Sequence, residues 1–254
     1  MPSMKQFYQE YWRRREVEGR LHTKEDMWVP QRIKIAVAMA SREGGPLSCI
    51  DVGCGEGTVG KLLRDALGKN LYIVGCDISG TALRNASSYY DEVFQIDFDS
   101  NGLWEMLYGR RFDKVICLET LEHLFKPKEL LEDFTKILKK DGEIIVSFPN
   151  VAWYNYRIDL LRGRFPQYVL HNPGEHIQNF TLDSFKDLLE KTGFVPVELD
   201  GQFRFPRFCR PARVFVPLLS KFPSLFGYQL VVRGILANKN QGASNGNSSS
   251  MPVG

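Results

Sequence analysis

Long apolar runs are missing from this sequence. No uninterrupted run of 18 or more apolar residues occurs among its 254 residues, whereas a membrane-spanning helix needs about 20. The N-terminus, MPSMKQFYQEYWRRR, also lacks the apolar core of a secretory signal. Hydrophobic residues at 43% and charged residues at 25% are typical of a soluble globular protein. We therefore expect no membrane span, no secretory signal and a cytoplasmic location.

Cysteine is scarce and irregularly spaced. The five cysteines are an odd number, and Cys49, Cys76 and Cys117 fall in apolar segments without C-x-x-C spacing. Buried thiols without such spacing are typical of reduced core residues. The sequence thus argues against a disulfide framework and against a zinc site.

Acidic residues are absent after Asp200, where seven Lys and Arg residues follow. The net charge of +3 therefore comes from one C-terminal stretch, and we expect no nucleic-acid binding. In this stretch arginines recur at 204, 207, 210 and 213 among phenylalanines. Three interpretations remain open: a solvated basic loop, a pocket rim for an anionic acceptor, or a peripheral contact of residues 203–226 with anionic lipid.

What the sequence does contain is a regular alternation of short apolar runs and amphipathic segments. Such alternation predicts an α/β fold: a Rossmann-like, doubly wound sheet of seven strands, the last antiparallel, with an N-terminal helical cap. The predicted strands span 47–52, 71–76, 92–96, 113–118, 143–148, 194–199 and 228–236. The predicted helices span 3–17, 26–41, 57–67, 79–88, 101–108, 127–139 and 181–191.

The same pattern predicts how the chain is divided. Residues 1–46 form the cap, and residues 47–237 form the main domain, with insertions at 149–180 and 201–227. Residues 238–254 are rich in Asn, Ser and Gly, which predicts a disordered tail.

A glycine-rich turn, CIDVGCGEGTVG, covers residues 49–60. An apolar run leads into glycines at 53, 55 and 57, and an amphipathic segment follows, which predicts a strand, a tight turn and a helix. Glycines let a ligand approach the backbone, and the N–H groups that begin the helix can then face that ligand. The spacing is G-x-G-x-G, because Thr58 stands where a dinucleotide-binding fingerprint has its third glycine.

Polar residues follow the next predicted strands, at the sheet edge where such folds bind ligands. Asp77 lies 24 positions after Gly53 and can accept hydrogen bonds from the vicinal hydroxyls of a ribose, although an acid that begins a helix is also ordinary. Asp97 can accept from an adenine amino group, while Ile78 and Phe98 can cover the ring or pack in the core. The loop Leu118–His123 places two acids and a histidine at the same edge.

Together these motifs resemble those of class I S-adenosylmethionine (SAM)-dependent methyltransferases. The resemblance runs from about Ile33 to Leu236 through IDVGCGEG, GCDIS, IDFD, FDKVICLETLEHL and LKKDGEIIVSFPN. It is strongest to the branch that contains the ubiquinone-type O-methyltransferases and the methionine-biosynthesis protein MetW. The resemblance implies SAM as cofactor, bound by Asp51, Gly53, Cys54, Gly55, Gly57, Asp77, Ile78, Asp97, Phe98, Leu118 and Glu119.

The ubiquinone-type relatives also carry a Glu-x-x-Glu-His pattern, described as binding a divalent metal near the acceptor. Glu119, Glu122 and His123 match this pattern, and their oxygen-rich set would suit Mg²⁺. Because the same pattern recurs in relatives without a known metal, we expect no metal here.

For the acceptor side, the sequence offers weaker signals. His123 and His176 are the candidate bases, since imidazole titrates near neutrality. The candidate acceptor contacts are Tyr11, Trp12, Trp153, Arg157, Arg207 and Arg210. We expect methyl transfer to a small-molecule acceptor, which can be anionic, on oxygen. The alternative is a SAM-binding partner protein of the MetW kind in methionine biosynthesis, without methyl transfer of its own.

Overall fold

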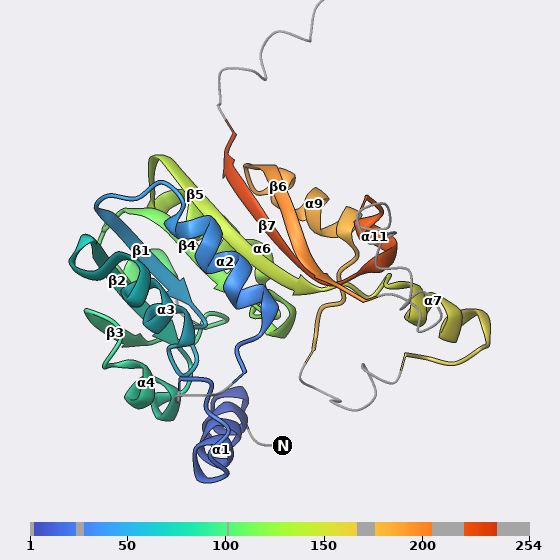
Figure 1. The fold of residues 1–254 in the computed structure, drawn as a ribbon, viewed down its shortest axis with the longest axis horizontal. Coiled ribbons are helices and arrows are strands. Elements are labelled where there is room, and N and C mark those ends of the chain that lie inside the picture. Colours follow the sequence, from blue (N-terminus) through green and yellow to red (C-terminus); the bar gives the residue numbers. More distant parts are fainter. Residues whose placement is uncertain (1–2, 24–27, 101, 167–175, 205–220, 238–254) are drawn as a thin grey trace, which may run out of the picture.

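The computed structural model describes residues 3–23, 28–100, 102–166, 176–204 and 221–237, which build one twisted sheet covered by helices on both faces (Figure 1). The strands are β1 (Leu47–Val52), β2 (Leu71–Asp77), β3 (Glu92–Gln95), β4 (Phe112–Leu118), β5 (Leu138–Pro149), β6 (Phe194–Phe203) and β7 (Gly227–Leu236). The helices are α1 (Met4–Val17), α2 (Gln31–Ser41), α3 (Thr58–Leu67), α4 (Gly80–Ala86), α5 (Leu103–Met106), α6 (Pro127–Ile137), α7 (Tyr154–Leu161), α9 (Leu182–Lys191) and α11 (Pro223–Phe226), with 3-10 turns η1 (Gly68–Asn70) and η2 (Leu121–His123).

The sheet has the order β3-β2-β1-β4-β5-β7-β6. Strands β1 to β5 pair in parallel, whereas β7 runs antiparallel to both β5 and β6. The predicted seven-stranded sheet with an antiparallel last strand is therefore confirmed. The direction of winding reverses between β1 and β4, and such a switch point opens a crevice at the carboxyl ends of the strands.

Apolar side chains fill both faces of the sheet. Consecutive residues of β1 point to opposite sides: Cys49 packs in the core under α2 and α3, and Ile50 packs in the core under α6 and α9. Both side chains are fully buried. A strand covered on both faces must be apolar throughout, which explains the continuous apolar runs in the sequence.

Several segments differ from the sequence-based prediction. Two strands are longer than expected: β5 begins at Leu138, where the preceding helix was expected to continue to 139, and β6 continues to Phe203, into the second predicted insertion. Helix α2 begins at Gln31, because its N-cap Pro30 has an extended ψ of 138°, and the described residues 28–30 are not helical. Helix α5 is only four residues long, since the left-handed Tyr108 (φ 50°) and Gly109 (φ 75°) end it. The insertion after β5 contains a helix, α7, where only a long loop was expected.

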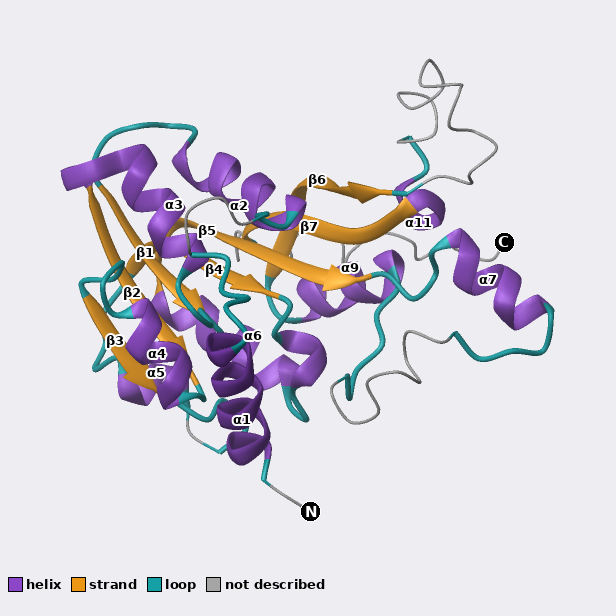
Figure 2. Cartoon of the chain, turned by 60° about the horizontal axis from the view of Figure 1, so that its bottom comes forward, coloured by secondary structure: helices purple, strands orange, loops and turns teal. Residues whose placement is uncertain are grey.

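Helix α1 lies below the carboxyl-end edge of the sheet (Figure 2). It begins with a capping box, in which Ser3 and Gln6 each accept from the other's backbone N–H. None of its residues is buried, so few of its side chains contribute to the core. Across the described ranges, no helix has the length and apolar character that crossing a bilayer requires.

Asn150 joins the beginning of the first predicted insertion to the end of the second. Its backbone N–H donates to Tyr228 O at 3.0 Å, and its side-chain Nδ2 donates to Ser224 O at 3.0 Å and Gly227 O at 2.8 Å. The residue is 1% exposed. Because a buried amide that loses its partners is costly, this side chain fixes the segment after β5 to the segment before β7.

The contact between Gly60 and Tyr90 generates a stability prediction. A Cβ at Gly60 would lie 2.6 Å from the Tyr90 ring, so Gly60→Ala should destabilise the protein by about 1–3 kcal/mol despite the better helix propensity of alanine. Chemical denaturation would measure the change. Gly80→Ala is the matched control, because its Cβ would meet nothing closer than 3.4 Å. Equal stability changes for the two variants would contradict the overpacking argument.

Candidate functional site

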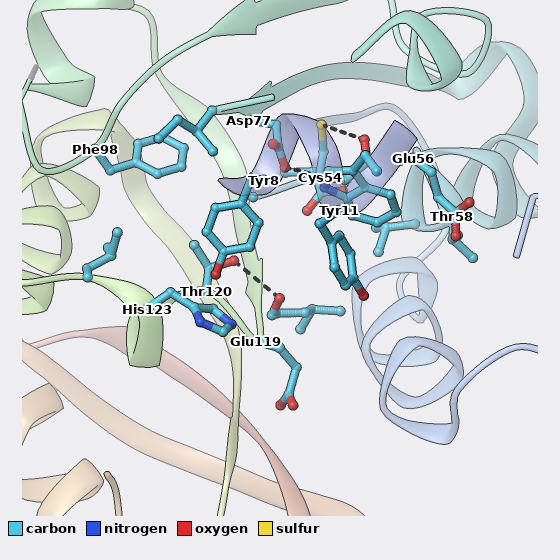
Figure 3. A pocket seen from close by; sticks show the side chains of 18 of the residues that line it. Tyr8, Tyr11, Cys54, Glu56, Thr58, Asp77, Phe98, Glu119, Thr120 and His123 are labelled. Carbon is cyan, nitrogen blue, oxygen red and sulfur yellow. Dashed lines mark hydrogen bonds between the residues drawn. The ribbon is translucent and has the colours of Figure 1, made fainter. Parts of the chain in front are cut away.

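A cavity of about 350 Å³ lies at the carboxyl ends of the central strands, closed on one side by α1 (Figure 3). Figure 3 shows Phe98 and Glu56 at opposite ends, with Tyr8, Tyr11 and Asp77 between them. All of the residues predicted to bind SAM line this cavity except Gly57. The cavity therefore lies at the crevice that the strand order predicts.

The glycine turn after β1 forms the cavity floor. Gly53 has a φ of 78° and Gly55 a φ of 53°, which side-chain-bearing residues rarely adopt. A Cβ at Gly53 would also collide with Thr120 Oγ1. The N–H groups of Gly53 and Cys54 both donate to Cys76 O, at 2.8 and 2.9 Å, so the turn is built onto the end of β2.

Gly57 does not line the cavity but allows two helices to pack closely. It is the N-cap of α3, and a Cβ there would lie 2.8 Å from the backbone of Ala86. The third glycine of the motif therefore lets α3 and α4 approach each other, while the first two shape the cavity.

Asp77 is buried beside this turn. Its Oδ2 accepts from Gly55 N at 2.9 Å, and its Oδ1 accepts from Ser79 N at 2.8 Å. Burial raises the pKa of Asp77 to about 6, although these backbone donors favour the charged form. Each oxygen retains a second lone pair, so the carboxylate can also accept from vicinal hydroxyls of a ligand.

Asp51 is a second buried acid under the turn. Tyr90 donates to Asp51 Oδ2 at 2.6 Å and itself accepts from Gly60 N at 3.1 Å. Burial raises the pKa of Asp51 to about 7, more than the bond from Tyr90 lowers it, and the charge of Asp77 adds to the rise. The cavity thus holds two adjacent carboxyl groups that favour a cationic ligand.

The other predicted SAM residues are held by their own loops. Asp97 accepts from Asp99 N and Ser100 Oγ, and it lines the cavity together with Ile78 and Phe98. Leu118 and Glu119 line it from the end of β4. Glu119 adopts a left-handed backbone, with a φ of 51°.

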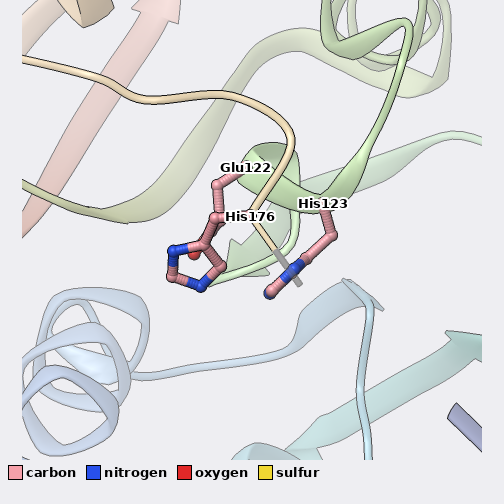
Figure 4. Close-up of side chains that lie close together, drawn as sticks. All are labelled: Glu122, His123 and His176. Atoms are coloured by element: carbon pink, nitrogen blue, oxygen red, sulfur yellow. The ribbon is translucent and has the colours of Figure 1, made fainter. Parts of the chain in front are cut away.

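Glu119 is turned away from the predicted metal set. Its Oε1 accepts from Ser147 Oγ at 3.1 Å, and its Oε2 accepts from Gln229 Nε2 at 2.9 Å. In the described residues, the donor atoms that come together are instead those of Glu122, His123 and His176, all within 4.8 Å of one another (Figure 4). The oxygen-rich Glu119–Glu122–His123 set that would suit Mg²⁺ is not the set that the fold assembles.

The cluster of Glu122, His123 and His176 combines η2 with the segment before α9. The two imidazole centroids lie 4.7 Å apart. Glu122 is completely buried and neither of its carboxyl oxygens has a hydrogen-bond partner, so burial and the nearby Glu119 raise its pKa well above its ordinary value. Burial, followed by the neighbouring His123, lowers the pKa of His176 to about 4, which keeps this imidazole neutral at pH 7.

Aromatic residues of α1 cover the cavity. Tyr8, Tyr11 and Trp12 all line it. A Cβ at Gly55 would lie only 2.7 Å from the Trp12 indole, so Trp12 packs directly against this glycine. Tyr8 stacks edge to face on His123, with centroids 5.7 Å apart. Tyr11 and Trp12, which were predicted as acceptor contacts, therefore lie beside the cavity.

Two of the predicted acceptor contacts do not line this cavity. Trp153 is buried among Tyr154, Tyr156 and Tyr228, where its Nε1 donates to Arg204 O at 3.1 Å. Arg157 donates to Ala152 O at 2.6 Å and to Ser224 Oγ at 3.2 Å. These contacts stabilise the insertion itself. Arg207 and Arg210, like most of the stretch 203–226 and the tail 238–254, lie outside the described residues.

Sequence reasoning missed five charged residues or histidines that line the cavity: Arg15, His22, Arg32, Glu56 and Asp99. Glu56 stands within the glycine motif and Asp99 lies two residues after Asp97, so their positions were usable signals. The other three come from the N-terminal 46 residues, where no motif distinguishes them from surface residues.

Comparison with known proteins agrees with this geometry. A family model described as "Methyltransferase domain" matches residues 22–199. A ubiquinone biosynthesis O-methyltransferase of Coxiella burnetii is 30% identical over 191 residues, which cover 70% of this chain and 79% of the relative.

Solved structures share the fold. A chain from the Haloferax volcanii complex that contains the Trm112 methyltransferase activator aligns with a TM-score of 0.63 and 18% identity, over 93% of this chain and 98% of the other. An S-adenosylmethionine-dependent methyltransferase from Mesorhizobium loti aligns with a TM-score of 0.58 and 18% identity, over 80% and 97%. At these identities, the likeness concerns the fold alone.

A glycine turn lies at the switch point of a seven-stranded sheet and is hydrogen-bonded to an acid at the end of β2, as expected for a class I methyltransferase fold. Given this fold and the family match, the chain belongs to the methyltransferase-domain family as a class I SAM-dependent methyltransferase.

The buried carboxyl of Asp77 generates a pH prediction. Its pKa of about 6 means that lowering the pH below 6 protonates it, which removes charge that a cationic donor favours. The contribution of Asp77 to SAM affinity should therefore be constant above about pH 7 and should fall by up to about tenfold per unit below about pH 6. Calorimetric titrations with SAM across this range would measure it.

Asp77→Asn is the informative variant, because the amide keeps one acceptor oxygen and loses the charge. SAM affinity should fall by about 1.5–3 kcal/mol, and the loss below pH 6 should disappear. Any pH dependence of SAM affinity that remains near pH 7 in this variant comes from Asp51, whose pKa is about 7. An unchanged pH profile in the variant would remove Asp77 from the donor site.

Proposed function

We propose that this enzyme transfers the methyl group of SAM to a hydroxyl oxygen of a small-molecule acceptor. Attack on a sulfonium methyl needs alignment, exclusion of water and removal of the acceptor's proton more than covalent help. The observation that carries the proposal is the pair of imidazoles, His123 and His176, at the cavity end of β4.

In the donor half, we assign Asp77 to the ribose hydroxyls, Ile78 and Phe98 to the adenine faces, and Asp97 to the adenine amino group. The turn Gly53–Gly55 and Leu118 then take the methionine part. This order follows the cavity from Phe98 past Asp77 to the glycine turn, as drawn in Figure 3.

In the acceptor half, His123 and His176 take the proton of the attacking hydroxyl. The pKa of about 4 keeps His176 uncharged at neutral pH, so one nitrogen of its ring can accept a hydrogen bond from the attacking hydroxyl. Tyr8 covers His123 and excludes water from this end. Arg32, whose Nη1 donates to Gln229 Oε1 at 3.3 Å, offers a positive charge to an anionic acceptor.

Two observations support an oxygen acceptor and a catalytic role for this protein. The Coxiella burnetii relative is named an O-methyltransferase, which favours an oxygen acceptor. That name also favours an enzyme over the MetW-like partner protein considered from the sequence. The paired imidazoles support the same choice, because SAM binding alone does not need a base.

A metal-assisted form of the reaction is the second candidate, because the Glu122 carboxylate is buried without a hydrogen-bond partner. Glu122, His123 and His176 would hold the ion. One carboxylate and two imidazoles suit a transition metal better than Mg²⁺. A bound ion would lower the pKa of an acceptor hydroxyl.

Methyl transfer from labelled SAM to a panel of small phenols, catechols and aliphatic alcohols tests the proposal. We expect an O-methylated product whose formation continues after dialysis against a chelator. Activity that is lost on dialysis and restored by Zn²⁺ or Co²⁺ would favour the metal-assisted form. Methylation of amines or thiols alone would contradict the choice of oxygen.

Replacing each histidine separately with glutamine tests the base. His123→Gln and His176→Gln keep side-chain volume and polarity but cannot accept the proton, so kcat should fall by about 10²–10⁴-fold in at least one variant, while SAM affinity stays within about twofold. Steady-state kinetics and calorimetry separate these effects. Unchanged kcat in both variants would exclude a base from this pair.

A further inference from the structure

The end of helix α7, residues 160–165, exposes large apolar side chains, and we call this segment the α7 tip. Leu161 is 87% exposed, Phe165 54% and Leu160 53%. A single exposed leucine or phenylalanine is ordinary on a protein surface, but several in one short segment mark a contact site. The α7 tip therefore needs a partner that removes these side chains from water.

The backbone of the tip is held in place by hydrogen bonds. Gly163 N donates to Leu160 O at 2.9 Å, and Arg164 N donates to Asp159 O at 2.8 Å. Gly163 has a φ of 68°, the left-handed conformation with which helices commonly end. A closed helix end, and not a frayed one, thus presents the apolar side chains.

The other end of α7 is anchored to the rest of the protein. Trp153 and Tyr156 are each 8% exposed, and the rings of both lie near Tyr228 at the beginning of β7. Figures 1 and 2 show α7 beyond the ends of β5 and β7, outside the helices that cover the sheet. Helix α7 is therefore a projecting arm with a packed root and an exposed tip.

The charge of the tip is positive. Arg162 and Arg164 are exposed, and across the described ranges neither guanidinium forms an ion pair with a carboxylate. Residues 150–166 contain three arginines and one acid, Asp159. Two cationic side chains without an internal partner thus stand among the exposed apolar ones.

The segment before β7 has the same character. Phe222 is 56% exposed, and the neighbouring Lys221 is exposed as well. Arg157 Nη2 of α7 donates to Ser224 Oγ of α11 at 3.2 Å, which ties this segment to the arm. No acidic residue follows Asp200 in the sequence. A second apolar side chain beside a cation therefore accompanies the tip.

Arginine among exposed leucine and phenylalanine suits a lipid interface, where guanidinium groups pair with anionic headgroups and apolar side chains enter the acyl boundary. A stable protein interface takes about 20–30 residues a side, far more than the tip offers. We propose that the α7 tip binds the surface of a bilayer that contains anionic lipid. The proposal goes beyond methyl transfer and does not depend on which acceptor the enzyme uses.

The arm leaves the sheet on the side of the cavity, because it follows the carboxyl end of β5 and the cavity lies at the carboxyl ends of the central strands. Binding through the tip would hold the protein by this side. No residue of the tip lines the cavity, so changes to the tip should leave the binding of SAM as it is.

Flotation of the full chain with lipid vesicles tests the proposal. The protein should float with vesicles of phosphatidylcholine mixed with phosphatidylglycerol, and much less with vesicles of phosphatidylcholine alone. Raising the salt concentration should weaken the binding, because salt screens the attraction between the arginines and the anionic headgroups.

Two variants assign the binding to the tip. Leu161→Ser removes an apolar side chain, and the double variant Arg162→Gln with Arg164→Gln removes two charges. Each should weaken binding to the mixed vesicles about tenfold or more. The SAM affinity and the thermal unfolding of both variants should remain those of the wild type, which shows that the fold is intact.

Matched controls lie far from the tip in the sequence. Tyr108→Ser removes a ring that is 89% exposed and follows α5. Arg13→Gln with Lys128→Gln removes two exposed charges from α1 and α6. Both controls should bind the mixed vesicles as the wild type does.

The absence of binding to mixed vesicles at low salt would overturn the proposal, as would equal binding to both kinds of vesicle. Controls that weaken binding as much as the tip variants would overturn it too, because any exposed group would then suffice. If sedimentation showed that the tip variants abolish self-association while no vesicle binding occurs, the tip would be a contact between copies of this chain instead. All of these outcomes leave the SAM site and the methyl transfer untouched.

Discussion

The carboxylate of Asp77 is the interaction on which the site depends. One oxygen holds the N–H of Gly55 in the turn after β1, and the other holds the N–H of Ser79 at the beginning of α4. Two loops from neighbouring strands thereby share a single buried charge. Without a carboxylate at the end of β2, the glycine turn would lose one of the anchors that keep it open to a ligand.

The cavity concentrates acidic groups, and this arrangement suits a donor whose charge changes during the reaction. Burial raises the pKa of the lining residues Asp51, Asp77 and Glu56 alike. A sulfonium ion offsets part of the cost of burying such groups, whereas the neutral thioether left after methyl transfer does not. The same acids that favour the donor therefore favour its exchange after the reaction, which is a way to limit product inhibition.

Sequence and structure agree where short-range patterns decide the outcome. The G-x-G-x-G turn, Asp77 and Asp97 follow strands directly, so the parallel order of β1, β2 and β3 brings them to one edge. The contributions of Arg15, His22 and Arg32 depend on how the N-terminal segment crosses the cavity, and no local pattern encodes that path. His176 reaches His123 from 53 positions away in the sequence, through the segment before α9.

In the insertion after β5, by contrast, the structure differs from what the sequence predicted. Trp153 and Arg157 carry the composition of a binding surface, but their partners are Tyr228, Ala152 and Ser224, so they stabilise the arm that bears them. Aromatic and arginine residues suit ligand contacts and internal packing equally well. Composition alone could not distinguish the two uses, because the distinction rests on a contact with β7, more than 70 residues further along the chain.

Asn150 constrains the two insertions together. Its single side chain ties the exit of β5 to the entry of β7, so the two insertions share one anchor at their roots. Lengthening or exchanging one of them alone changes the geometry in which the other is held. Redesign of either insertion in this scaffold therefore has to treat both segments as one unit.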